Sequence, residues 1–161
     1  MTEEKFNHAV TAYGDNLYRI AFGWCKNRAD AEDVVQDAFI KYLRADRTFA
    51  SEEHIRNWLI RVVINDCKKL MRAPSRVRCE PLEEYAQRLY ADEPEDGDLF
   101  LAVMGLPQKE RVAVHLYYYE GYSVKEISRL LLVNESTIQS RLASARKKLK
   151  SKLKEAWNSD E

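Results

Sequence analysis

The chain has 161 residues, its 26 basic and 26 acidic side chains cancel, and 45% of its residues are hydrophobic. This length and composition fit one ordinary domain or two small ones, and they exclude collagen-like, disordered and membrane-embedded classes. No apolar run is long enough to span a bilayer, and the N-terminus has acids where a secretory signal needs basic residues. We therefore expect a soluble, cytoplasmic protein without membrane insertion.

The first half of the chain predicts a succession of helices. Apolar residues recur at steps of three and four from Phe6 to Trp24, which is the stripe of a long amphipathic helix. A break follows, and Asp30 is predicted to cap a second helix through its side-chain oxygens. The apolar side of that second helix is predicted to consist of Val35, Phe39 and Tyr42.

A third helix is predicted to begin after Ser51, where two acids complement the exposed amides of a first turn. Its apolar residues keep helical spacing to about Met71. The three helices form a first predicted domain, residues 1–73. The composition then changes to prolines and acids, so residues 74–97 are predicted to be a linker with one short helix that opens at Pro81.

Two helix-start signals lie close together in a second predicted domain, residues 98–161. Ser123 and Glu126 have the spacing of a capping box, which predicts a helix of about two turns. Asn134 is then a good N-cap for another helix, which begins at Glu135. The three or four residues between these helices are typical of a helix-turn-helix, whose second helix enters the major groove of DNA.

The second helix of this pair has a basic outer side. Seven basic residues and no acid lie between Ser136 and Lys154. Its apolar stripe directs small polar and basic side chains to the opposite face. Glutamine can bond to an adenine edge, serine to base edges or phosphate, and lysine and arginine can neutralise phosphates. The predicted DNA contacts are Ser136, Gln139, Ser140, Ala143, Arg146, Lys147 and Lys148.

Each of these features also has an ordinary explanation. A lysine-rich helix is usually a solvated face, and a short helix pair is often only a helical hairpin. A helix-turn-helix repressor or activator that does not join a polymerase stays open, as does a helical interaction module without a DNA role. An enzyme is not predicted, because the sequence has no glycine-rich phosphate loop and its three histidines and three cysteines lack catalytic or metal-ligand spacing. No catalytic residue, metal or cofactor is therefore expected.

Most of residues 6–153 also resembles a known family. The run from Leu106 to Lys150, with its LP, ER, EG and EI pairs and its SRLASARKKL stretch, resembles the C-terminal promoter-reading domain of bacterial extracytoplasmic-function sigma factors. The segment NRADAEDVVQDAFIKYL resembles the sigma helix that binds the clamp of the polymerase β′ subunit. The segment HIRNWLIRVVINDCKKLMR resembles the part that opens and holds the −10 promoter element.

The resemblance implies an all-α sigma factor in which region 2 and region 4 are the two domains. Such a protein binds core RNA polymerase through the β′ clamp and the β subunit, recognises −10 and −35 elements, and promotes DNA opening. An anti-sigma factor is a further implied partner. The implied polymerase contacts are Asp33, Gln36 and Asp37. The implied −10 contacts are Asn65, which would meet an unstacked base, and Lys68, Lys69 and Arg72, which would hold the backbone.

Two positions depart from the family pattern. The family usually has glycine where this chain has Leu132, at a turn that favours a positive φ, so Leu132 implies either local strain or a rearranged turn. The family often has a basic residue where this chain has Gln139, and some members have one at Ser144. These differences imply an unusual −35 preference. Trp58 could stack on an unstacked base, but its place in the apolar stripe favours core packing.

Overall fold

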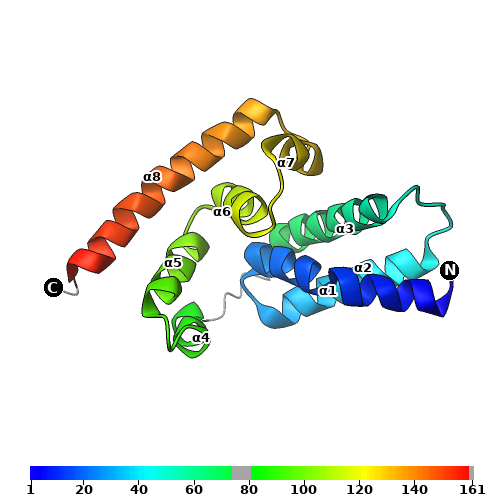
Figure 1. Ribbon diagram of the computed structural model, residues 1–161, viewed down its shortest axis with the longest axis horizontal. Helices are drawn as coiled ribbons and strands as arrows, with labels where there is room; N and C mark the ends of the chain where they lie inside the picture. The colour runs from blue at the N-terminus through cyan, green and yellow to red at the C-terminus, as the bar shows by residue number, and fades with distance from the viewer. Residues whose placement is uncertain (74–80, 160–161) are drawn as a thin grey trace. The chain divides into compact units, whose positions relative to one another are not determined.

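The computed structural model describes residues 1–73 and 81–159, and the chain divides into two compact units, Met1–Cys79 and Glu80–Glu161. The described residues form helices and no strand, which confirms the predicted all-α fold (Figure 1). None of the helices in this part of the chain is both long and apolar enough to cross a membrane.

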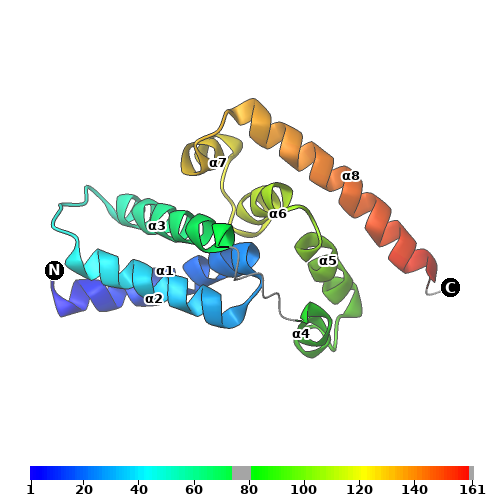
Figure 2. The same ribbon diagram turned by 180° about the vertical axis from the view of Figure 1, so that it is seen from behind.

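Three long helices make up the first unit: α1 (Glu3–Cys25), α2 (Arg28–Arg44) and α3 (Glu52–Arg72). Each packs against the other two, and views from opposite sides show them lying side by side (Figures 1 and 2). Their core is apolar and its largest fully buried side chains are Leu17, Ile20, Leu59, Ile60, Val63 and Ile64. The first unit is therefore a three-helix bundle with its own hydrophobic core.

The start of α2 differs from the prediction. Its cap is Asn27 rather than Asp30, and the Asn27 side chain accepts a hydrogen bond from the Asp30 backbone N–H at 2.9 Å. The cause is the sharp end of α1, where Lys26 has a φ of 52° and leaves Asn27 extended, so that α2 begins at once. In this register Val34 is buried and the predicted Val35 is only half-buried.

The second unit contains shorter helices and one long one. In chain order they are α4 (Leu82–Leu89), α5 (Pro94–Met104), α6 (Gln108–Val114), the π-helical turn η1 (His115–Tyr119), α7 (Val124–Leu131) and α8 (Glu135–Ser159). The long helix α8 packs against α5, α6 and α7. The core of this unit is built around Leu106, Val114, Leu116, Ile127, Ile138 and Leu142.

The structure is more helical than the linker predicted for residues 74–97. The short helix expected after Pro81 is α4, but α5 already begins at Pro94 and packs against it. Phe100 lies between Tyr85 and Tyr90, with ring centroids 5.9 and 5.8 Å away. Four of the acids that suggested a linker, Glu83, Glu84, Glu95 and Asp96, lie in the first turns of these helices, where they complement the helix dipole. Residues 74–80 of the predicted linker lie outside the described residues.

The connection between α7 and α8 is the predicted helix-turn-helix turn. The Glu126 N–H donates to Ser123 Oγ and the Ser123 N–H donates to Glu126 Oε1, both at 3.1 Å, which confirms the capping box. Leu132 follows α7 in a left-handed conformation, with φ 57° and ψ 46°, and is 84% exposed. The turn therefore keeps the geometry that favours glycine, and Leu132 carries the strain.

Candidate nucleic-acid and protein-binding surfaces

The four residues predicted to meet the −10 element share one face of α3. Asn65, Lys68, Lys69 and Arg72 follow the spacing of a single helical stripe, on the side opposite the buried Val63. Asn65, Lys69 and Arg72 are exposed and Lys68 is half-buried. Within the described residues no acid forms an ion pair with these three cations. The structure thus brings the predicted set together as a polar strip with net positive charge.

The strip continues toward the start of α3 into a hollow of about 350 Å³. The hollow is lined by Arg47, Ser51, Glu53, His54, Asn57, Trp58 and Arg61. An aromatic ring, an amide and guanidinium groups are the side chains that bind unstacked bases, by stacking and by hydrogen bonds to base edges. Asn57, Arg61 and Asn65 are spaced four residues apart, and this spacing was the sequence signal by which the hollow could have been found.

Trp58 packs in an aromatic cluster and also lines the hollow. Its ring packs against Phe49 and Tyr42, with centroids 5.5 and 6.3 Å away, so it belongs to an aromatic cluster that ties α2 to α3. The same residue lines the hollow and is only half-buried. Core packing was therefore a correct expectation for Trp58, and it leaves part of the side chain accessible.

The residues predicted to bind polymerase lie on the surface of α2. Asp33, Gln36 and Asp37 are all exposed and line a hollow of about 640 Å³ formed by α2 and α3. Lys41 of α2 crosses to Asp66 of α3, with its Nζ 2.9 Å from both carboxylate oxygens. The two helices are thus joined beside an acidic edge, which is suited to a protein surface that carries basic groups.

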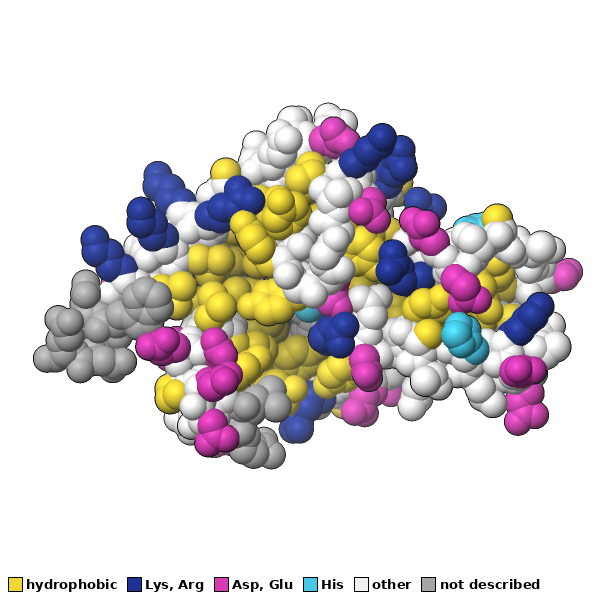
Figure 3. Space-filling view, viewed as in Figure 1, with side chains coloured by type: hydrophobic (Ala, Val, Ile, Leu, Met, Phe, Trp, Pro, Cys, Tyr) yellow, Lys and Arg dark blue, Asp and Glu magenta, His cyan; other side chains and the backbone are white. Residues whose placement is uncertain are grey.

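The predicted DNA-binding residues of α8 all reach the surface. Ser136, Gln139, Ser140, Ala143, Arg146, Lys147 and Lys148 are exposed, opposite or beside the stripe of the buried Ile138, Leu142 and Ala145. Figure 3 shows lysine and arginine side chains in a row along the outer edge of α8. Small residues precede the cations along the helix, so its first turns can approach a groove floor closely.

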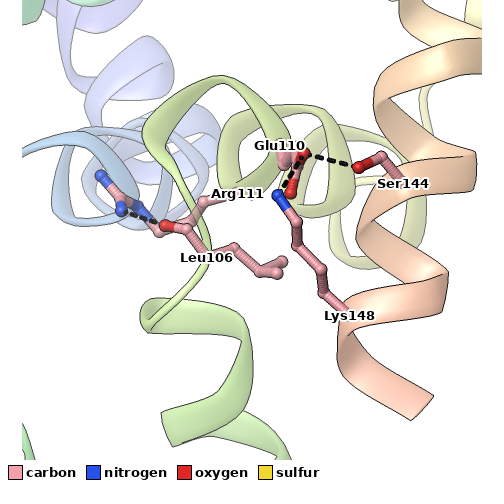
Figure 4. Close-up of polar contacts among 5 residues, drawn as sticks. All are labelled: Leu106, Glu110, Arg111, Ser144 and Lys148. Carbon is pink, nitrogen blue, oxygen red and sulfur yellow. Dashed lines mark hydrogen bonds and ion pairs between the residues drawn. The ribbon is translucent and has the colours of Figure 1, made fainter. Parts of the chain in front are cut away.

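Lys148 has a protein partner that the sequence analysis missed. Its Nζ lies 2.9 Å from Oε1 of Glu110 on α6, and the same oxygen accepts a hydrogen bond from Ser144 Oγ at 2.8 Å (Figure 4). Burial by itself raises the pKa of Glu110, but the bonds from Lys148 and Ser144 outweigh it, so this pKa lies below its usual value. The predicted phosphate contact is therefore already ion-paired within the protein.

Beside this contact, Arg111 fixes the start of α6. It is 5% exposed, and its Nη1 donates to the carbonyl oxygen of Leu106 at 3.0 Å (Figure 4). A buried guanidinium needs such acceptors, because an unpaired charge in the core is very unfavourable. Arg111 thus binds the backbone before α6, while Glu110 binds two side chains of α8.

Arg146 is oriented by an aromatic residue. Its Nε donates to the hydroxyl of Tyr118, and its guanidinium carbon lies 5.6 Å from the centroid of the same ring. Tyr118 belongs to the π-helical turn η1 and is 53% exposed. This contact fixes the direction of Arg146 while leaving its side chain at the surface. The run of three tyrosines in HLYYY was the only sequence signal for it.

Models of two protein families match the chain. The model described as "Sigma-70 region 2" matches residues 9–77, and that described as "Sigma-70, region 4" matches residues 97–149. The chain is 31% identical to the ECF RNA polymerase sigma factor SigM of Mycobacterium tuberculosis, over 89% of this chain and 74% of that protein. It is 27% identical to the RNA polymerase sigma factor SigV of Bacillus subtilis, over 89% of this chain and 88% of that protein.

Solved structures have the same fold. The sigma factor RpoE of Bartonella quintana, in complex with the anti-sigma factor NepR, superposes with a TM-score of 0.69 at 20% identity, covering 94% of this chain and 98% of that one. CnrH in complex with the cytosolic domain of CnrY gives a TM-score of 0.67 at 23% identity, covering 95% of this chain and 90% of that one.

Proposed function

The chain belongs to the ECF sigma factors of RNA polymerase, and we propose that it binds core RNA polymerase, recognises −10 and −35 promoter elements and promotes DNA opening. The observation that carries this proposal is the presence of two DNA-compatible helix faces in units that match different sigma regions. The alternative, a repressor or activator that never joins polymerase, gives no role to the strip on α3 or the acidic edge of α2. The protein would act in the bacterial cytoplasm and would itself catalyse no chemical reaction.

In the first unit, α3 would hold the opened strand. The Asn65 amide can bond to the edge of an unstacked −10 base, while Lys68, Lys69 and Arg72 neutralise the adjoining backbone. The hollow beside Trp58 would receive such a base, because stacking and guanidinium contacts are available there together. These contacts favour melted DNA over duplex, since the base edges and faces that they need are covered in the duplex.

In the second unit, α8 would read the −35 duplex. Gln139 is exposed near the start of the helix, where a bidentate bond to adenine is possible. Lys147 and Arg146 would contact phosphates, and Arg146 is already oriented by Tyr118. Lys148 is assigned a weaker DNA role than the sequence suggested, because Glu110 already neutralises it.

Two protein partners are proposed. The exposed acidic edge of α2, with Asp33, Gln36 and Asp37, would face the β′ clamp, and the β subunit would complete the contact with core polymerase. An anti-sigma factor is the second proposed partner, supported by the solved structure of the same fold in such a complex. Reversing charge with Asp33→Arg should reduce recovery of core polymerase in a pull-down. Asp15→Arg, on the exposed side of α1, is its matched control.

Transcription with purified core polymerase tests the main proposal. The wild-type chain should direct run-off synthesis from a subset of a genomic promoter library and make −10 thymines reactive to permanganate. Asn65→Ala should reduce open complexes more than closed ones, and a premelted promoter should restore them. Asn7→Ala, at an exposed position of α1, is the control. Absence of promoter-dependent synthesis under all conditions would refute the sigma-factor function.

A further inference from the structure

The start of α3 is held by two hydrogen bonds of one histidine to successive residues of the preceding loop. The His54 N–H donates to Ser51 Oγ at 3.1 Å, and His54 Nδ1 accepts from the Ala50 N–H at 3.0 Å. The capping box of α7 differs in its second bond, because the carboxylate of Glu126 accepts from the N–H of the cap residue Ser123 itself. At α3 the imidazole instead accepts from Ala50, the residue before the cap Ser51, so it ties the preceding loop to the helix.

The hydrogen bond at Ala50 requires a neutral imidazole. When Nδ1 accepts from a backbone N–H, the single ring proton lies on Nε2. Nη2 of Arg47, which is also a donor, lies 3.5 Å from Nε2. A second ring proton would therefore remove the acceptor for Ala50 and place two cations side by side. Histidine is the side chain whose charge ordinarily changes between about pH 5 and 8.

Charged groups from the loop and from α3 lie around the ring. Arg47 of the loop and Arg61 of α3 line the same hollow as His54, against one acid, Glu53. The other first-turn acid, Glu52, is engaged elsewhere: its carboxylate accepts a hydrogen bond from Tyr13 and lies 3.4 Å from the His8 ring of α1.

The histidine supports a loop that has few other anchors. Phe49 is the main one, with its ring centroid 5.2 Å from His54, 5.6 Å from Tyr42 and 5.5 Å from Trp58. The Arg47 guanidinium lies 5.3 Å from the Phe49 ring centroid. The neighbouring residues Thr48 and Ala50 are exposed. Loss of the bond at Ala50 therefore frees the part of the loop that brings Arg47 to the hollow.

We propose that His54 is a positioning residue that holds the Arg47–Ser51 loop in place for base capture, and that its protonation releases this loop. The proposal rests on the function proposed for the hollow beside α3. It predicts that acid weakens promoter opening through the first unit. The −35 helix should lack this sensitivity, because the cap of the preceding helix α7 is formed by a serine and a glutamate and contains no histidine.

Open-complex formation by the holoenzyme tests the proposal with two variants of one residue. His54→Gln places at the same position a side-chain acceptor that does not titrate, whereas His54→Ala removes the acceptor. At about pH 8 we expect wild type and His54→Gln to form equal amounts of open complex. At about pH 5.5 wild type should form about threefold to tenfold less than His54→Gln, a factor that corresponds to the loss of one hydrogen bond. His54→Ala should be reduced by a similar factor at both pH values.

The amount of open complex formed by wild type, divided by the amount formed by His54→Gln at the same pH, is independent of the effect of pH on the polymerase itself. A ratio that does not change with pH would overturn the role of the loop in promoter opening, as would full activity of His54→Ala. Glu126→Gln is the matched control in the second unit, and its ratio to wild type should stay constant over this range.

A measurement on the free chain separates this proposal from the proposed function. Amide exchange at Ala50, followed by NMR in the full chain without polymerase, should show protection in wild type at about pH 8 and loss of it in His54→Ala. Protection should persist to about pH 5.5 only in His54→Gln. If amide exchange follows this pattern but no variant alters transcription, His54 holds the loop as proposed, and the loop has no part in base capture. If Ala50 is equally protected in all three chains, the proposed role of His54 itself is refuted.

Discussion

The helices α3 and α8 both present cations to solvent, but the protein holds them differently. On α8, Arg146 is directed by Tyr118 and Lys148 is paired with Glu110. On α3, Lys68 and Arg72 have no ion-pair partner in the part of the chain that the structure describes. The face of α8 is therefore set before DNA arrives, which suits a rigid duplex. The face of α3 keeps its charge free, which suits a flexible strand that exists only after opening.

The largest expected effect tests whether each helix depends on its own core. Ile60 of α3 and Ile138 of α8 are both fully buried. Ile60→Ala and Ile138→Ala should each lower the free energy of unfolding by about 2 to 5 kcal/mol, because each leaves a cavity. Urea unfolding followed by NMR signals of each unit should show one transition shifted in each variant. A shift of both transitions by either variant would contradict separate cores.

The next effect concerns the support of α8. Glu110→Gln should destabilise the second unit by about 1.5 to 3 kcal/mol, because it removes a charge that accepts two hydrogen bonds from α8. Lys41→Met removes one ion-pair partner in the first unit, and the Lys41 side chain is 50% exposed, so it should cost less. Thermal unfolding of both variants measures the difference.

The same carboxylate gives the second unit a pH dependence. Since the pKa of Glu110 is lowered on folding, its stabilisation is fully present above the unfolded value of about 4.3 and is lost as the pH falls through the folded value. Glu110→Gln should remove this part of the acid destabilisation. An unchanged stability profile between about pH 5 and 3 would show that the bonds to α8 do not matter.

A smaller effect of opposite sign is expected at the turn before α8. Leu132→Gly should stabilise the second unit by about 0.5 to 1 kcal/mol, because it relieves a positive φ without losing buried surface. Leu132→Ala keeps the strain and should have little effect. Melting temperatures of the two variants distinguish them, and equal values would show that Leu132 is not strained.

The smallest effect sharpens the contrast between free and paired cations. Lys147→Ala should lower the salt dependence of promoter binding by about 0.9 in the log–log slope, whereas Lys148→Ala should lower it less because Glu110 already pairs with it. Gln139→Ala should leave the slope unchanged and relax preference at one −35 base pair. Holoenzyme binding to promoter variants across salt concentrations reports both quantities. Equal slopes for the two lysine variants would contradict the assigned ion pair.

The sequence by itself determined the all-α class and the helix faces. Apolar spacing and local caps are encoded within a few residues, so Ser51, Ser123 and Glu135 marked helix starts correctly. Asn65 and Arg72 came from the family resemblance, and both are exposed on α3. Local signals failed where one helix ends within a few residues of the start of the next. Asn27 is the N-cap of α2 because α1 ends at Lys26 in a left-handed conformation.

Only the tertiary structure decided which side chains on those faces are free. Glu110 meets Lys148 across 38 residues of sequence, and Tyr118 meets Arg146 across 28. Sequence spacing carries no information about such pairs, because the packing of α6 and η1 against other helices brings them together. The hollow at His54 has the same origin, since it needs the loop from α2 to fold back over α3 and expose one side of an aromatic cluster.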